Sequence, residues 1–60
     1  MIKDVMRIFN IKDYVYDPID KTLIIYEKVP VNVFVRIKYY TKNYVDNYIV
    51  KTDRTKRLNV

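Results

Sequence analysis

Residues Pro30–Tyr44, PVNVFVRIKYYTKNY, decide the fold, because their pattern fits both a strand and a helix. With a period of two, the apolar residues from Val29 to Tyr39 alternate with a second set, as in a strand of high β-propensity. That second face would carry Phe34, Arg36, Lys38 and Tyr40. An aromatic and basic strand face is typical of RNA-binding sheets.

With a period of 3.6, the same stretch is a helix with one apolar stripe. The stripe consists of Val33, Ile37, Tyr40 and Tyr44, flanked by Phe34. Pro30 would then occupy the first helical position, where its missing N–H costs nothing. The preceding link, Glu27 to Pro30, is a poor hairpin turn, since it holds no Gly, Asn or Asp. We therefore predict a helix over 30–44 and keep the strand as the alternative.

A β-hairpin is predicted over residues 13–28. Two β-prone runs, Tyr14–Tyr16 and Thr22–Tyr26, flank the turn signal Asp17-Pro18-Ile19-Asp20. Asp accepts hydrogen bonds from its own backbone in such turns, and Pro fixes φ at the second position.

Upstream, residues 2–9 show helical spacing of apolar residues, and Asn10 is suited to end that helix in the left-handed conformation. Downstream, 47–52 reads as a third strand after a turn at Asp46-Asn47, followed by a basic tail over 53–60. The predicted fold is α+β, in the order α-β-β-α-β, with α-β-β-β-β as the alternative. A small antiparallel sheet, the hairpin plus one further strand, would carry one or two short helices on one face. Residues 1–52 form its single compact domain.

The composition excludes many kinds of site. The sixty residues include no Gly, Ala, Ser, Gln, His, Cys or Trp. Disulfides, thiolate zinc sites, Ser or Cys nucleophiles, His general bases and Gly-rich phosphate loops are therefore absent. Asp13, Asp17 and Asp20 cluster near the turn, but turn chemistry explains them without a metal ion. We expect no enzyme, cofactor or metal site.

The charge of +5 lies wholly in the second half of the chain. Residues 1–30 hold equal numbers of basic and acidic side chains, whereas 31–60 hold seven basic and two acidic ones, with four tyrosines among them. Such asymmetry is typical of a surface that meets a polyanion, and tyrosine rings can stack on unpaired bases. The candidate nucleic-acid-binding residues are Arg36, Lys38, Tyr40, Lys42, Tyr44, Lys51, Arg54, Lys56 and Arg57.

The sequence thus predicts a small, non-enzymatic protein that associates with RNA or DNA. It would be an accessory component of a ribonucleoprotein such as the ribosome, or a small DNA- or RNA-binding factor. The alternative is a protein-interaction module, such as a viral or plasmid-encoded inhibitor or an obligate homo-oligomer, because a domain this small is marginal alone. With no predicted membrane span or signal peptide, we expect a cytoplasmic protein. Abundant Ile, Val, Lys and Tyr without Gln or Cys suggests a thermophilic archaeon or one of its viruses.

Overall fold

A computed structural model describes residues 1–52, and the tail at 53–60 lies outside the described residues. The elements follow in the order α1 (Ile2–Ile8), β1 (Tyr14–Asp17), β2 (Thr22–Ile25), α2 (Val31–Thr41) and β3 (Asn47–Val50). This order confirms the α+β fold class and the helix over residues 30–44. Pro30 sits one position earlier than expected, with its φ of −59° and ψ of 149° marking it as the N-cap.

The hairpin has the expected turn chemistry. Asp17 pairs with Thr22 across the strands, and the Asp17 carboxylate accepts hydrogen bonds from the amides of Ile19 and Asp20, at 3.0 and 3.3 Å. The chain has no glycine, so the left-handed position at the end of the loop falls on Lys21, whose φ is 53°. Asn10 takes the same conformation after α1, with φ of 60°, as its sequence position predicts.

The sheet is mixed rather than antiparallel throughout. The strand order is β1-β2-β3, with β1 antiparallel and β3 parallel to β2. The cause is the position of α2 between β2 and β3. The chain runs back along the sheet through α2, so β3 begins at the same end of the sheet as β2 and runs in the same direction. In this register Leu23 lies beside Tyr48, and Ile24 beside Ile49.

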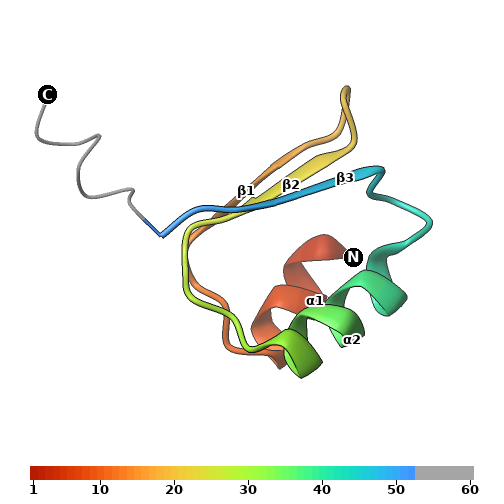
Figure 1. Cartoon of the computed structure of the whole chain (residues 1–60). Coiled ribbons are helices and arrows are strands. Elements are labelled where there is room, and N and C mark those ends of the chain that lie inside the picture. The colour runs from red at the N-terminus through yellow and green to blue at the C-terminus, as the bar shows by residue number, and fades with distance from the viewer. Residues whose placement is uncertain (53–60) are drawn as a thin grey trace, which may run out of the picture.

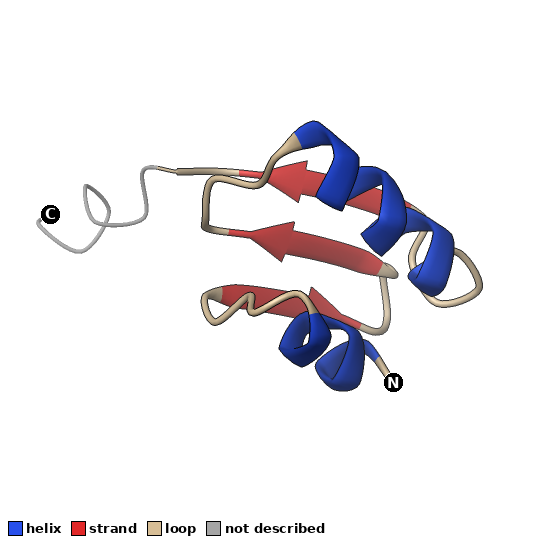
Figure 2. Cartoon of the chain, turned by 90° about the horizontal axis from the view of Figure 1, so that it is seen from below, coloured by secondary structure: helices blue, strands red, loops and turns tan. Residues whose placement is uncertain are grey.

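Both helices cover the same face of the sheet, which gives two layers (Figures 1 and 2). The core between the layers consists of Ile2, Val5, Met6, Ile11, Leu23, Ile25, Ile37 and Val45. Met6, Leu23 and Ile37 are fully buried and anchor α1, β2 and α2 respectively. In the described part of the chain, no helix is long and apolar enough to cross a membrane.

The helical phase of α2 differs from the predicted stripe. Its buried residues are Ile37 and Thr41, whereas Tyr40 is 55% and Tyr44 39% exposed. A threonine fits inside because its hydroxyl is satisfied there: it donates to the Ile37 carbonyl at 2.7 Å and lies 2.6 Å from the Tyr48 hydroxyl. Thr41 therefore ties α2 to β3, and the tyrosines turn outward.

Candidate nucleic-acid interface

Four of the nine predicted site residues lie on α2 or immediately after it. Because α2 packs Ile37 and Thr41 against the sheet, its remaining positions form two flanks and an outer ridge. Arg36 and Tyr40 lie on the flank toward α1, where both line a pocket with α1 residues. Lys38 and Lys42 lie on the other flank, toward β3. The strand alternative, with Phe34, Arg36, Lys38 and Tyr40 on one face, is wrong, because a helix places these residues on two flanks.

The cations of α2 lie against aromatic rings. The Lys38 ammonium is 4.9 Å from the Phe34 ring centre and 5.5 Å from that of Tyr48. The Lys42 ammonium is 5.2 Å from the centre of the Tyr39 ring. Such contacts hold a lysine at a defined place on the surface while leaving its charge in water.

Two tyrosines stand out from the helix layer. Tyr39 is 66% exposed, and its ring meets that of Tyr40 edge to face, with centres 5.5 Å apart. The Tyr40 ring also meets that of Phe9, the residue directly after α1, with ring centres 6.1 Å apart, which links the two helices at the surface. The exposed rings offer flat apolar surface next to positive charge, as a stacked nucleobase requires.

A hollow of about 310 Å³ opens between the helices, lined by Val5, Ile8, Phe9, Arg36 and Tyr40. Ile8 is 75% exposed at its edge. The lining is apolar apart from the Arg36 guanidinium and the Tyr40 hydroxyl. It can therefore take a flat apolar group that carries hydrogen-bond acceptors.

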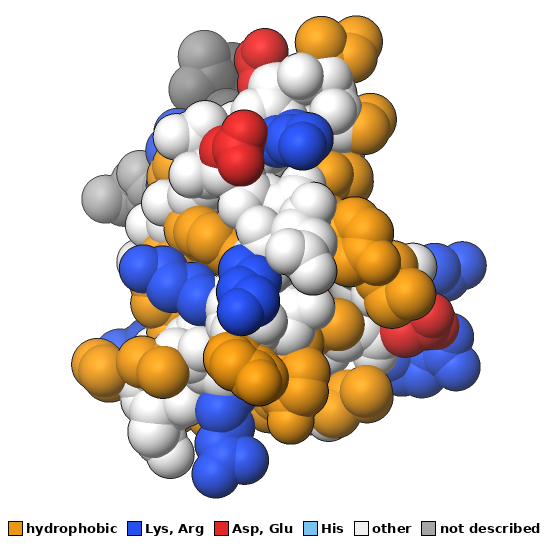
Figure 3. Space-filling view, turned by 90° about the vertical axis from the view of Figure 1, so that its right-hand side faces the viewer, with side chains coloured by type: hydrophobic (Ala, Val, Ile, Leu, Met, Phe, Trp, Pro, Cys, Tyr) orange, Lys and Arg blue, Asp and Glu red, His pale blue; other side chains and the backbone are white. Residues whose placement is uncertain are grey.

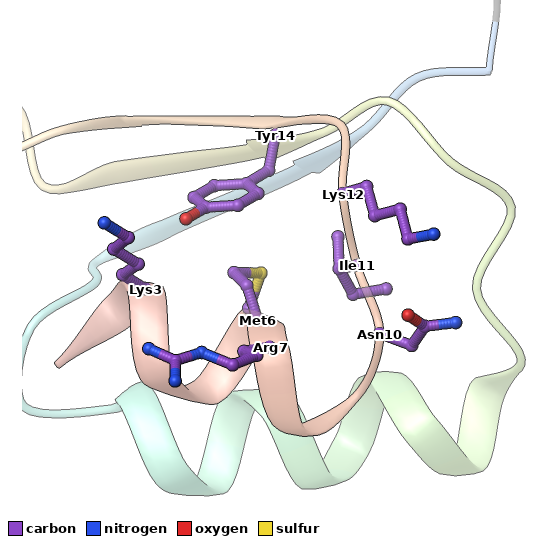
Figure 4. A pocket seen from close by; sticks show the side chains of 7 residues that line it. All are labelled: Lys3, Met6, Arg7, Asn10, Ile11, Lys12 and Tyr14. Carbon is purple, nitrogen blue, oxygen red and sulfur yellow. The ribbon is translucent and has the colours of Figure 1, made fainter.

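A second pocket, of about 240 Å³, lies on the far side of α1 (Figure 4). The buried side chains of Met6 and Ile11 face the Tyr14 ring across it, and the cations Lys3, Arg7 and Lys12 stand around its rim. The sequence prediction missed these three cations, because residues 1–30 are neutral when counted together. The only signal was the spacing of Lys3 and Arg7, which puts both on one side of a helix.

The fold separates the charges that the sequence mixes. The two helices and Lys42 carry five basic residues, Lys3, Arg7, Arg36, Lys38 and Lys42, and one acidic residue, Asp4. Asp4 is already paired, with Arg7 at 3.2 Å and the N-terminal ammonium at 3.7 Å. The rest of the described chain holds Lys12, Lys21, Lys28 and Lys51 against Asp13, Asp17, Asp20, Glu27 and Asp46.

Figure 3 shows how charged side chains are distributed on one side of the molecule. Lys and Arg side chains lie among hydrophobic ones over the helices in the lower half of the view. Acidic side chains are seen near the hairpin at the top and at one edge. The helix layer is therefore the basic side of the described domain.

The other predicted residues are not part of this surface. Tyr44 turns toward the N-terminus, lining a hollow with Met1 and Tyr14, and its carbonyl accepts a hydrogen bond from the Tyr16 hydroxyl. Lys51 directly follows β3, whereas Lys42 directly follows α2 and precedes β3, so β3 separates the two cations along the chain. The predicted contacts at Arg54, Lys56 and Arg57 lie outside the described residues.

Known proteins add nothing to this geometry. No protein-family model matches the chain, and searches of curated proteins and of solved structures also find no match. Within residues 1–52, no group of three or more His, Cys, Asp or Glu side chains is placed to hold a metal ion.

Proposed function

We propose that this protein binds nucleic acid through its helix layer, as a non-enzymatic component of a ribonucleoprotein or a small DNA- or RNA-binding factor. The observation that carries the proposal is the charge of this layer: five cations face solvent on and beside two helices, and the single carboxylate among them, Asp4, is paired with one of the five, Arg7. The other four cations therefore have no carboxylate beside them among the described residues. A regular polyanion meets such a surface without like-charge repulsion.

A single strand fits the surface better than a duplex. Helices α1 and α2 lie side by side over the sheet, so they present a broad surface rather than a single isolated helix (Figure 2). A single strand instead exposes its bases, and Tyr39 and Tyr40 are available for stacking beside the hollow between the helices. The cations on either flank of α2 would contact successive phosphates.

The test is fluorescence anisotropy with a labelled generic single strand and a matched duplex, titrated across a salt series. For single strands the slope of log affinity against log salt is about −0.7 per neutralised phosphate, so five engaged cations give at most about −3.5. The variant Arg36→Ala/Lys42→Ala should reduce the magnitude of that slope by about 1.4. Tyr39→Leu should weaken single-strand binding by about 1–3 kcal/mol, with the slope unchanged.

The matched control removes one cation from the other side of the molecule. Lys21 is exposed in the hairpin loop, and Lys21→Asn keeps a residue that tolerates its positive φ. This variant should bind like the parent protein. If it loses about half as much affinity as Arg36→Ala/Lys42→Ala, which removes two cations, binding follows net charge and the helix layer is not the site. Absence of binding at low salt would overturn the proposed function.

A further inference from the structure

The second face of the sheet has no covering element within the described residues, since both helices lie on the first (Figures 1 and 2). Strand pairing sets Val15 beside Ile24 and Ile24 beside Ile49, which makes one apolar row across all three strands. Val15 is 42% and Ile49 39% exposed. A continuous apolar row on an open sheet face is typical of an interaction surface.

Charge is distributed unevenly across this outer face. Alternation along the strands places Asp13 and Asp17 on the β1 side and Lys51 on the β3 side. The central strand contributes only uncharged side chains to it, Thr22, Ile24 and Tyr26. Asp13, Tyr26 and Lys51 form one row across the three strands. The Tyr26 amide donates a hydrogen bond to the Asp13 carbonyl, and the Lys51 amide donates one to the carbonyl of Ile25, the residue before Tyr26. The face therefore carries two carboxylates along the β1 edge, Ile24 at its centre and one ammonium, Lys51, at the end of the β3 edge.

We propose that a second copy of the chain covers this face, around a two-fold axis that runs along β2. Rotation about that axis lays β1 of one copy over β3 of the other and leaves each row opposite itself. Asp13 then faces the partner's Lys51, Val15 faces the partner's Ile49, and Ile24 meets its own counterpart at the axis. One carboxylate thereby meets an ammonium and apolar residues meet apolar residues, while Asp17 faces the partner's uncharged Asn47. The face is therefore complementary to itself at the Asp13 and Val15 rows.

The small size of the domain also favours dimerisation, and the small size of the face indicates how strong the dimer can be. A chain of this length buries too small a fraction of its surface to be more than marginally stable alone, and packing two sheets adds a second apolar layer. The face is only three strands wide, and each strand is four residues long. The buried area is therefore small for a protein interface, and the dimer should be weak, with a dissociation constant in the micromolar range. Both helix layers remain on the outside, so dimerisation does not compete with the proposed nucleic-acid surface.

Sedimentation velocity of the purified full chain tests the proposal, over about 10 µM to 1 mM and without nucleic acid. We expect a concentration-dependent shift from monomer to dimer. Ile24→Lys brings two like charges together at the axis and should raise the dissociation constant at least about 100-fold. The control is Ile19→Lys, the same change at a residue that is 91% exposed at the hairpin tip, which should dimerise normally. A monomeric parent protein at the highest concentration, or an Ile24→Lys variant that dimerises like it, overturns the proposal.

A charge exchange tests the direction of the axis. Lys51→Glu alone should weaken the dimer about 10-fold, because it faces the partner's Asp13. The double variant Asp13→Lys/Lys51→Glu restores opposite charges across the axis and should recover most of that loss. Circular dichroism confirms that each variant is folded before it is compared. A double variant as weak as the single one would refute the two-fold arrangement.

Discussion

The contact between Thr41 and Tyr48 offers the sharpest test of how α2 is fixed to the sheet. Thr41 is fully buried, and its hydroxyl proton is directed to the Ile37 carbonyl at 2.7 Å. The Tyr48 hydroxyl must therefore be the donor in the 2.6 Å contact between the two side chains. Its other acceptor, the Lys38 carbonyl, lies at 3.4 Å. The side-chain contact is thus the stronger of the two that Tyr48 makes.

The loss of stability expected for each variant depends on whether a buried hydroxyl is left without its hydrogen-bond partner. Tyr48→Phe keeps the ring that packs edge to face on Phe34 and removes one hydrogen bond, at a cost of about 1 kcal/mol. Thr41→Val keeps the buried shape but leaves the Tyr48 hydroxyl with the long contact to Lys38, at a cost of about 1–2 kcal/mol. The double variant removes both partners, so we expect it to cost less than the sum by about 1 kcal/mol.

The assay is urea unfolding followed by circular dichroism for the parent protein, the two single variants and the double variant. In a domain of this size each 1 kcal/mol also lowers the melting temperature by roughly 4–8 °C, which gives an independent readout. A coupling energy below about 0.3 kcal/mol would mean that the two hydroxyls act independently. In that case the contact would not be what fixes the helical phase of α2.

Two further predictions concern the loops. The Glu27 carboxylate accepts hydrogen bonds from the backbone amides of both Lys12 and Asp13. Glu27→Ala should therefore cost about 1.5–3 kcal/mol in urea unfolding, whereas Glu27→Gln, which keeps an acceptor oxygen, should cost less; equal losses would refute a role for the charge. Lys21→Gly should raise the free energy of unfolding by about 0.5–1 kcal/mol, because Lys21 holds a positive φ without a local side-chain contact that favours it. Asn10→Gly should change stability little, since asparagine already tolerates this region; a larger gain there than at Lys21 would contradict the argument.

The order of elements could be predicted from the sequence because it depends on local signals. The hairpin has its Asp-Pro turn, the first helix its apolar spacing and Asn10, and residues 30–44 follow a link that cannot make a tight hairpin. Local signals do not indicate which edge of the hairpin β3 joins. Beside β2 the helical crossover makes β3 parallel, whereas beside β1 the same chain direction would make an antiparallel pair.

The inner stripe of α2 was misassigned because Thr41 counts as polar in any pattern of hydrophobic residues. Tyr40 and Tyr44 count as apolar and fit the same period, so the predicted stripe turned them toward the core. The structure buries Thr41 instead, since its hydroxyl is bonded within the helix and to Tyr48. A satisfied hydroxyl can be buried at little cost, and a tyrosine at the surface keeps its own hydroxyl hydrated.

The separation of charge follows partly from the residue types that the chain lacks. With no glycine or serine to shape its loops, the chain uses acidic residues to satisfy loop amides, as Asp17 does in the hairpin turn and Glu27 beside β1. These carboxylates are thereby committed to the loops at the ends of the sheet. The helices need no such residues, and between Glu27 and Asp46 the chain has none at all. A variant that removes a loop carboxylate therefore reports on folding, whereas Arg36, which makes none of the ion pairs found among the described residues, reports on binding.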